Sequence, residues 1–271
     1  MDILFFCPRW GQAHVPWKAF AQKVKDAGYD GVETDIPVDE KERNELLEIL
    51  DSKGLRLIAQ HWETVEPDFE KHLEAYTERL AVMTLAKPLF INSQTGKDYY
   101  SFSQNEALIH IAEMAAAVTG IPIYHETHRG KFSFAAHVTQ KYIDALPLLC
   151  LTLDISHWCV VAETLLHDQA HAVSKAISRT KHVHARIGAT QSAQVTDPHL
   201  PEWEETLQFH LSCWDSVVEQ NKKEGNSMLT FTTEFGPHPY MINLPSSGKP
   251  VADQWDINLY MKELLTKRYR K

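Results

Sequence analysis

The segment Ala27-Gly28-Tyr29-Asp30-Gly31 joins a helical pattern to a short apolar run, and the same kind of junction recurs along the chain. Lys53-Gly54 and Thr119-Gly120 also close helical patterns just before apolar runs. Glycine at this position is typical of the residue that ends an α-helix. The recurrence therefore indicates a repeating helix-to-strand unit, which is typical of parallel sheets.

Strand-like runs and helical patterns alternate eight times along the 271 residues. The predicted strands are Ile3–Cys7, Gly31–Thr34, Leu55–His61, Leu89–Ser93, Ile121–Glu126, Cys150–Asp154, His182–Arg186 and Met228–Glu234. The predicted helices are His14–Ala27, Glu40–Ser52, Phe69–Leu85, Asn105–Val118, Lys131–Leu146, Leu165–Ser178, Glu204–Lys222 and Ala252–Tyr269. Eight repeats without a GxGxxG or P-loop motif favour a closed (β/α)8 TIM barrel over an open doubly wound sheet. With no linker-like stretch, we expect one domain spanning 1–271.

Composition narrows the classes of function. The chain is 44% hydrophobic and 23% charged, and 27 basic against 36 acidic residues give a net charge of −9. No basic patch offers the footprint that nucleic acids require. We find no signal peptide and no apolar window long enough to span a membrane. Four scattered cysteines without a CxxC pair are typical of reduced thiols, so we expect a cytoplasmic protein.

Four segments rich in carboxylates and imidazoles follow successive predicted strands. They are Tyr124-His125-Glu126-Thr127-His128, Leu153-Asp154-Ile155-Ser156-His157, His182-Val183-His184 and Thr233-Glu234-Phe235. A barrel brings the C-terminal ends of its strands to one mouth, where residues far apart in sequence become neighbours. Three carboxylates and one imidazole at that point predict a divalent-metal site.

Strand alternation gives a separate indication of which side chains face inward. Glu126 and His125 point to opposite faces of their strand. His182, His184 and Arg186 share one face, which predicts His184 near the mouth and Arg186 at the rim. Threonines lie two residues before Asp154 and Glu234, where they are suited to hydrogen-bond the ligands.

These residues resemble the xylose-isomerase-like TIM-barrel superfamily of sugar phosphate isomerases and epimerases. The resemblance covers almost the whole chain, from Gly28-Tyr29-Asp30-Gly31-Val32-Glu33 to Glu234-Phe235-Gly236-Pro237. It implies one divalent ion held by Glu126, Asp154, His184 and Glu234. It also implies that His157 lies beside the metal or the substrate. Relatives form dimers and tetramers through their outer helices, which makes a homo-oligomer possible here. The sequence leaves the oligomeric state open.

The donor set indicates both the metal and the chemistry. A site made mostly of oxygen favours Mn²⁺, Mg²⁺ or Co²⁺ and leaves Zn²⁺ open. An ion chelating a carbonyl and an adjacent hydroxyl stabilises an enediolate, while Glu126 and Glu234 are the candidate acid–base pair. Glu33 fits a structural partner better than a catalyst. We therefore predict a metal-dependent isomerase or epimerase acting on a sugar, a sugar acid or a sugar phosphate.

Aromatic residues follow three of the predicted strands and are candidates for stacking on sugar rings: Trp10, Trp62 and Trp158. His61 and Gln94 are candidates for binding substrate hydroxyls. Arg129 or Arg186 could receive a carboxylate. No glycine-rich phosphate cradle follows strands seven or eight, so we expect a neutral or carboxylated substrate.

Three alternatives use the same barrel. A lyase would dehydrate a hydroxy acid, with Arg129 as the carboxylate anchor. An endonuclease-type hydrolase would use several metals against DNA, which the acidic net charge disfavours. A non-catalytic sugar-binding barrel would not need paired carboxylates.

Overall fold

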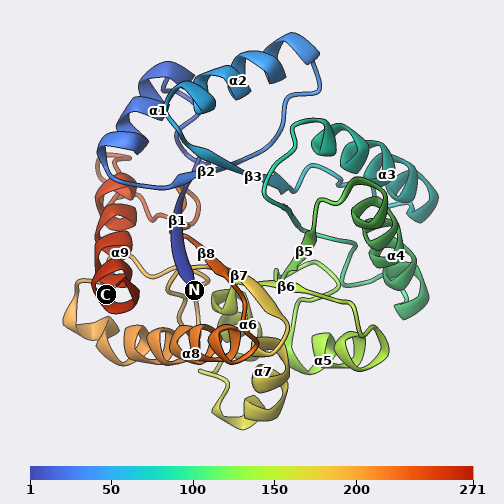
Figure 1. Ribbon diagram of the computed structural model, residues 1–271. Helices are drawn as coiled ribbons and strands as arrows, with labels where there is room; N and C mark the ends of the chain where they lie inside the picture. The colour runs from blue at the N-terminus through green and yellow to red at the C-terminus, as the bar shows by residue number, and fades with distance from the viewer. Residues whose placement is uncertain (271) are drawn as a thin grey trace.

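Eight parallel strands close into a barrel in the computed structural model, which describes residues 1–270 (Figure 1). Each strand pairs with the next, and β8 pairs with β1. The fold is therefore a (β/α)8 TIM barrel, as the alternation predicts. The strands are β1 (Asp2–Pro8), β2 (Gly31–Thr34), β3 (Arg56–His61), β4 (Ile91–Ser93), β5 (Ile123–Glu126), β6 (Leu151–Leu153), β7 (Thr180–His184) and β8 (Met228–Thr232).

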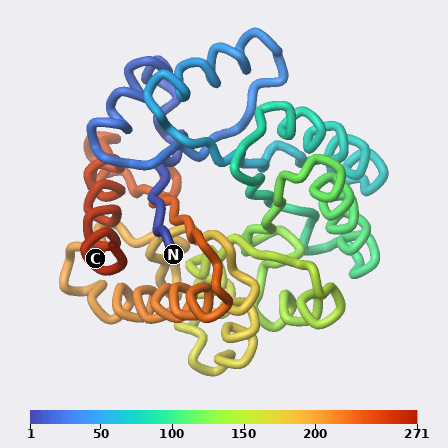
Figure 2. Tube along the Cα trace, in the orientation of Figure 1, coloured from blue at the N-terminus to red at the C-terminus, as the bar shows by residue number. Residues whose placement is uncertain are grey.

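An outer ring of helices surrounds the sheet, and the colours of Figure 2 run once around the barrel from blue to red. The α-helices are α1 (Trp17–Asp26), α2 (Glu40–Ser52), α3 (Phe69–Leu85), α4 (Phe102–Thr119), α5 (Ala136–Ala145), α6 (Ile155–Ala162), α7 (Ala170–Ile177), α8 (Glu204–Lys223) and α9 (Gln254–Tyr269). Two 3₁₀ turns, His167–Gln169 and Pro201–Trp203, precede α7 and α8. Local caps fix several helix starts; Ser101 and Gln104, for example, form a capping box on α4.

Most element ends differ from the sequence prediction by a few residues, and three of the differences bear on the site. The extra helix α6 begins directly after Asp154, because the Asp154 carboxylate accepts a hydrogen bond from Ser156 N and caps it. Helix α5 begins at Ala136 rather than Lys131, so the residues before it form a loop over the mouth. Strand β7 ends at His184 rather than Arg186.

The barrel interior has an apolar lower layer and a polar upper layer. Phe6, Ile58 and Phe90 fill the lower layer, with Leu4 and Tyr124 packed against them. Side chains alternate along each strand. A second set of inward-facing residues therefore lies nearer the C-terminal ends of β2, β3, β4, β5 and β7, at the mouth of the barrel. That upper layer contains Glu33, Gln60, Asn92, Glu126 and His184, all buried.

Two local features help to close the barrel: the close packing of β2 against β3, and the contact of the C-terminal helix with β1. A Cβ on Gly31 would lie 2.3 Å from the Arg56 carbonyl oxygen, so only glycine permits the close approach of β2 to β3. Helix α9 lies beside β1 (Figure 2), and just beyond it the Arg270 guanidinium donates to the Ile3 carbonyl at 2.8 Å. Among residues 1–270, no helix is both long and apolar enough to cross a membrane.

Truncation of Phe90, which fills part of the apolar lower layer, tests how much that layer contributes to the stability of the barrel. The Phe90 ring lies 5.0 Å from the His182 ring and 4.7 Å from the Tyr124 ring. Phe90→Ala should lower the free energy of unfolding by about 3 to 5 kcal/mol, because it leaves a cavity inside the barrel. Phe102→Ala, at a ring that is 40% exposed, should cost about 1 kcal/mol. Urea denaturation measures both, and equal losses would contradict this account of the core.

Candidate metal centre

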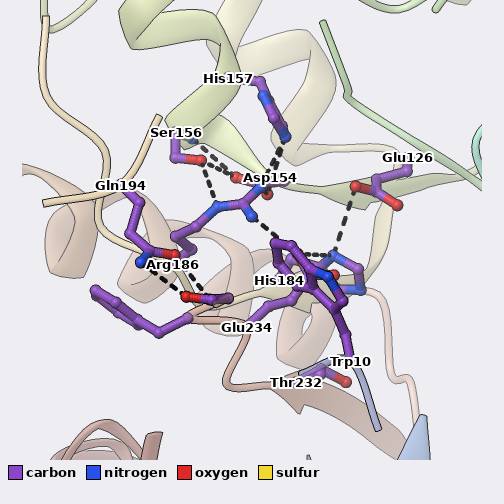
Figure 3. A network of polar contacts seen from close by, with 12 residues as sticks. Trp10, Glu126, Asp154, Ser156, His157, His184, Arg186, Gln194, Thr232 and Glu234 are labelled. Carbon is purple, nitrogen blue, oxygen red and sulfur yellow. Dashed lines mark hydrogen bonds and ion pairs between the residues drawn. The ribbon is translucent and has the colours of Figure 1, made fainter. Parts of the chain in front are cut away.

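Four side chains from consecutive strands meet at the barrel mouth (Figure 3). Glu126 ends β5, Asp154 follows β6, His184 ends β7 and Glu234 lies two residues beyond β8. One oxygen or nitrogen atom from each lies within 4.8 Å of the others. All four side chains are buried. The structure thus brings together the four residues that the sequence predicts as ligands.

Two buried atoms in this cluster face each other without a hydrogen bond. His184 Nδ1 lies 2.8 Å from Glu234 Oε2, and neither atom has a hydrogen-bond partner among the described residues. His184 Nδ1 is also 3.6 Å from Glu126 Oε1. Leaving such atoms unsatisfied is costly, whereas a divalent cation would engage both. The donor set of three carboxylates and one imidazole therefore fits a metal ion.

A buried layer below the cluster orients His184. Its Nε2 donates to Glu33 Oε1 at 3.0 Å, which leaves the Nδ1 lone pair for a metal. His182 Nε2 lies 3.2 Å from the other Glu33 oxygen, and the Thr232 hydroxyl donates to that same oxygen. The structure places Thr232 under Glu33 rather than beside Glu234, and Thr152 Oγ1 has no partner among residues 1–270. Glu33 is thus a structural partner of the imidazoles.

Charge compensation in this layer shifts the pKa values of both partners. Burial alone would raise the pKa of Glu33, but His184 and His182 hold it well below its usual range. Burial alone would lower the pKa of His184, but Glu234, Glu33 and Glu126 raise it well above its usual range. The layer therefore favours a positive charge at His184, carried by the protonated imidazole when no metal is bound; a divalent ion bound to the neutral imidazole would supply that charge instead.

Amide side chains hold the two candidate acid–base groups. Asn92 Nδ2 donates to Glu126 Oε2 at 3.1 Å, and Gln94 Nε2 donates to the same oxygen at 3.2 Å. Gln60 Nε2 donates to Glu234 Oε1 at 3.1 Å. Sequence reasoning missed Gln60 and Asn92. Their inward parity near the ends of β3 and β4 is a signal that could have identified them.

Arg186 lies inside the cluster rather than at the rim, where the sequence predicts it. The side chain is 1% exposed. Its Nη2 donates to Asp154 Oδ2 and to His157 Nε2, the latter at 2.7 Å (Figure 3). Its Nη1 lies 3.6 Å from Glu234 Oε2. Because β7 ends at His184, strand alternation no longer determines where Arg186 points.

Arg186 and its neighbours perturb one another electrostatically. Burial raises the pKa of the Asp154 carboxyl to about 6, against the opposing effect of Arg186. Burial also lowers the pKa of His157 well below its usual range and that of His128 to about 4. Both imidazoles are therefore neutral near pH 7, so Arg186 is the fixed cation next to Asp154.

A cavity of about 450 Å³ opens above the cluster. Trp10, Trp62 and Tyr240 give it aromatic walls, and Gln94 also lines it. The indole of Trp10 lies so close to Gly236 that a Cβ there would be 2.0 Å from the ring, so the tryptophan covers the backbone just after Glu234. Sequence reasoning missed Tyr240, which comes from the long loop after β8.

Other predicted substrate-binding residues do not line the cavity. His61 is buried and its ring nitrogens contact Ser93 Oγ at 3.1 Å and Thr64 Oγ1 at 2.7 Å. Trp158 is fully buried, and its Nε1 donates to the Ser133 carbonyl at 2.8 Å. The sequence places both at the mouth, but the structure uses them to anchor loops, because each side chain points back into the protein.

Two further predicted residues lie beside the cavity without lining it. The His157 ring packs 3.9 Å from that of His128, centroid to centroid, and His128 does line the cavity. Arg129 is exposed, with its guanidinium 5.0 Å from the centre of the Tyr240 ring. His157 thus supports one wall, and Arg129 lies outside it.

Neither a family model nor a curated protein matches this sequence. Solved structures align over the whole chain. The probable 3-DHS dehydratase AsbF of Bacillus anthracis is 16% identical, with a TM-score of 0.62 and 98% of this chain and 99% of that chain covered. The 3-keto-D-glucoside 4-epimerase YcjR of E. coli is 15% identical, with a TM-score of 0.62 and 98% of this chain and 100% of that chain covered. Endonuclease IV of Thermus thermophilus is 11% identical, with a TM-score of 0.61 and 97% of this chain and 99% of that chain covered.

Xylose isomerase domain proteins also align with this chain. The chain therefore has the fold of xylose-isomerase-like barrels, and the predicted resemblance is confirmed at the level of fold. Proteins of this fold carry out different reactions, so fold alone does not assign one here.

Removal of the imidazole tests the metal centre. The wild-type chain should bind one Mn²⁺, and His184→Ala should weaken binding by more than about 100-fold, because it removes the nitrogen atom that would contact the ion directly. His72→Ala is the matched control, since His72 is a buried histidine on α3 that is not among the clustered ligands. Isothermal titration calorimetry measures both. Unchanged binding in His184→Ala would exclude this centre.

Proposed function

We propose that this protein is a divalent-metal-dependent isomerase or epimerase of sugars. One observation carries the proposal: of the four clustered ligands, Glu126 and Glu234 line the cavity, whereas Asp154 and His184 do not. Two carboxylates thus face a bound substrate while the other two ligands anchor the ion behind them. This division of roles suits proton transfer between two sides of one substrate.

The metal, when bound, supplies the positive charge that polarises a substrate carbonyl. Glu126 and Glu234 remove a proton from the carbon next to that carbonyl and return it. Return to the opposite face of the same carbon gives an epimer, and delivery to the neighbouring carbon gives an isomer. Gln60, Asn92 and Gln94 hold the two carboxylates in place by donating to them. The walls of Trp10 and Trp62 exclude water from the reacting atoms.

The charge balance supports a neutral substrate. Glu33, Glu126, Asp154 and Glu234 bring four negative charges, while a divalent ion and Arg186 bring three positive ones. The loaded centre then has a net charge near −1, which does not attract a carboxylate or a phosphate. Aromatic walls suit the apolar C–H faces of a sugar. These features favour a neutral polyhydroxy carbonyl compound.

The alternatives find less support in the site. A hydroxy-acid lyase needs a cation in the cavity that is free to anchor a carboxylate. Arg186 is paired with Asp154, and Arg129 does not line the cavity. Arg9 does line it, but its guanidinium donates to the Ala13 and Val15 carbonyls and lies over the Trp17 ring. An endonuclease must approach a polyanion, which a net charge of −9 opposes. A sugar-binding barrel without activity would not require two carboxylates facing the ligand. We also propose a cytoplasmic location, in keeping with four free cysteines.

Isosteric replacement tests the acid–base pair. Glu126→Gln and Glu234→Gln keep an oxygen ligand but lose the base, so kcat should fall by about 100-fold or more. Glu224→Gln, at an outer ion pair with Lys181, should leave the rate unchanged. The measurement is solvent deuterium incorporation into a panel of ketoses and aldoses in D₂O with Mn²⁺. Normal incorporation by both site variants would refute the assignment of the bases.

Replacement of the exposed arginine tests substrate charge. Arg129→Met should change KM by less than about 2-fold, because a neutral sugar gains nothing from the guanidinium. For a carboxylated or phosphorylated substrate anchored there, KM should instead rise by about 10- to 100-fold. Steady-state kinetics on the best neutral and anionic substrates distinguishes the two. A large rise would overturn the assignment of a neutral substrate.

A further inference from the structure

Arg186 occupies an unusual place for a cation, because it lies inside the ligand set of a predicted cation site. Its guanidinium contacts Asp154 through Nη2 and approaches Glu234 through Nη1, so it spans two of the four ligands. Arg186 lines the cavity, whereas Asp154 does not. The arginine therefore lies between the cavity and the Asp154 carboxylate.

The guanidinium is held in place on several sides. Its Nε donates to Ser156 Oγ at 3.2 Å, and Ser156 in turn donates to the second Asp154 oxygen at 2.5 Å. The Tyr240 ring covers it, with the Arg186 Cζ 4.8 Å from the ring centre. A cation fixed in this way remains beside Asp154 and Glu234 whatever else enters the centre.

A fixed cation has opposite effects on the empty and the loaded centre. Without a metal, Arg186 offsets the repulsion between buried carboxylates that would otherwise destabilise the fold. With a metal, it is a like charge close to a divalent ion in a poorly screened interior, which weakens metal binding. Part of the negative charge that would attract the ion is already compensated.

We propose that Arg186 is a built-in counter-cation of the metal centre. It stabilises the metal-free barrel and lowers the affinity for the divalent ion, so that the ion exchanges with the surroundings instead of being held permanently. This inference rests on the metal centre of the proposed function but not on its reaction. It also gives Arg186 a role other than the substrate anchor that the sequence suggests.

The experiment measures Mn²⁺ affinity by calorimetry and thermal stability in the presence of a chelator. Arg186→Met and Arg186→Gln should bind Mn²⁺ about 10- to 100-fold more tightly than wild type, and their metal-free Tm should fall. Arg186→Lys keeps the charge and should stay close to the wild-type affinity. Arg43→Met is the matched control, because Arg43 is a buried arginine that donates to the Pro37 and Val38 carbonyls. It should lose stability without gaining affinity.

The direction of the change is decisive, because structural damage weakens metal binding and only the removal of a like charge strengthens it. Unchanged or weaker binding by Arg186→Met and Arg186→Gln would overturn the proposal. Should either variant fail to fold without metal, refolding with Mn²⁺ followed by competition with a chelator yields the same affinity comparison. If the wild type and all variants bind no Mn²⁺, the metal centre itself fails, and with it the proposed function. If Mn²⁺ binds with an affinity that does not depend on the charge at position 186, this inference alone is overturned.

Discussion

Four carboxylates are buried together at one end of the barrel, and the rest of the site is arranged to compensate their charge. Glu33, Glu126, Asp154 and Glu234 are each at most 3% exposed. Buried carboxylates are tolerated only when they are paired or hydrogen-bonded. Imidazoles pair with Glu33, amide groups donate hydrogen bonds to Glu126, and Arg186 forms an ion pair with Asp154. The unsatisfied atoms of His184 and Glu234 mark the place where this compensation is incomplete without a further cation.

Backbone geometry and charge compensation meet at Asp154. Its Oδ1 caps α6 by accepting from Ser156 N at 3.1 Å, while its Oδ2 faces Arg186. Thr127 Oγ1 accepts from Asp154 N at 2.8 Å and donates to its carbonyl at 2.9 Å. One side chain thus starts a helix, pairs with a cation and points an oxygen toward the candidate metal. Its position is fixed by backbone contacts rather than by packing of the side chain alone.

The sequence predicts the barrel and the ligand cluster because both depend on short-range periodicity. Alternation along a strand places Glu126 and His184 inward, and strand order brings them to one mouth. Features beyond the strand ends were not predictable in this way. Arg186 turns inward after β7 has ended, and Trp158 lies on α6, where it anchors a loop. His61, by contrast, ends β3 next to the inward-facing Gln60, so strand alternation does place it on the outer face of the sheet. Helix α6 was missed because the Asp154 that caps it also ends an apolar run that resembles a longer strand.

Strand order also explains how one cluster can both anchor an ion and expose two reactive groups. The four ligands come from β5, β6, β7 and β8 in sequence, so the ligands after β6 and β7 lie between the other two. Those central positions hold Asp154 and His184, which do not line the cavity. The flanking positions hold Glu126 and Glu234, which do. The curved sheet therefore exposes its outer two ligands to the cavity, and its inner two would lie behind a bound ion. The proposed division of roles between anchoring ligands and acid–base groups would then follow from the curvature of the barrel, and each ligand needs only to lie at the end of its own strand.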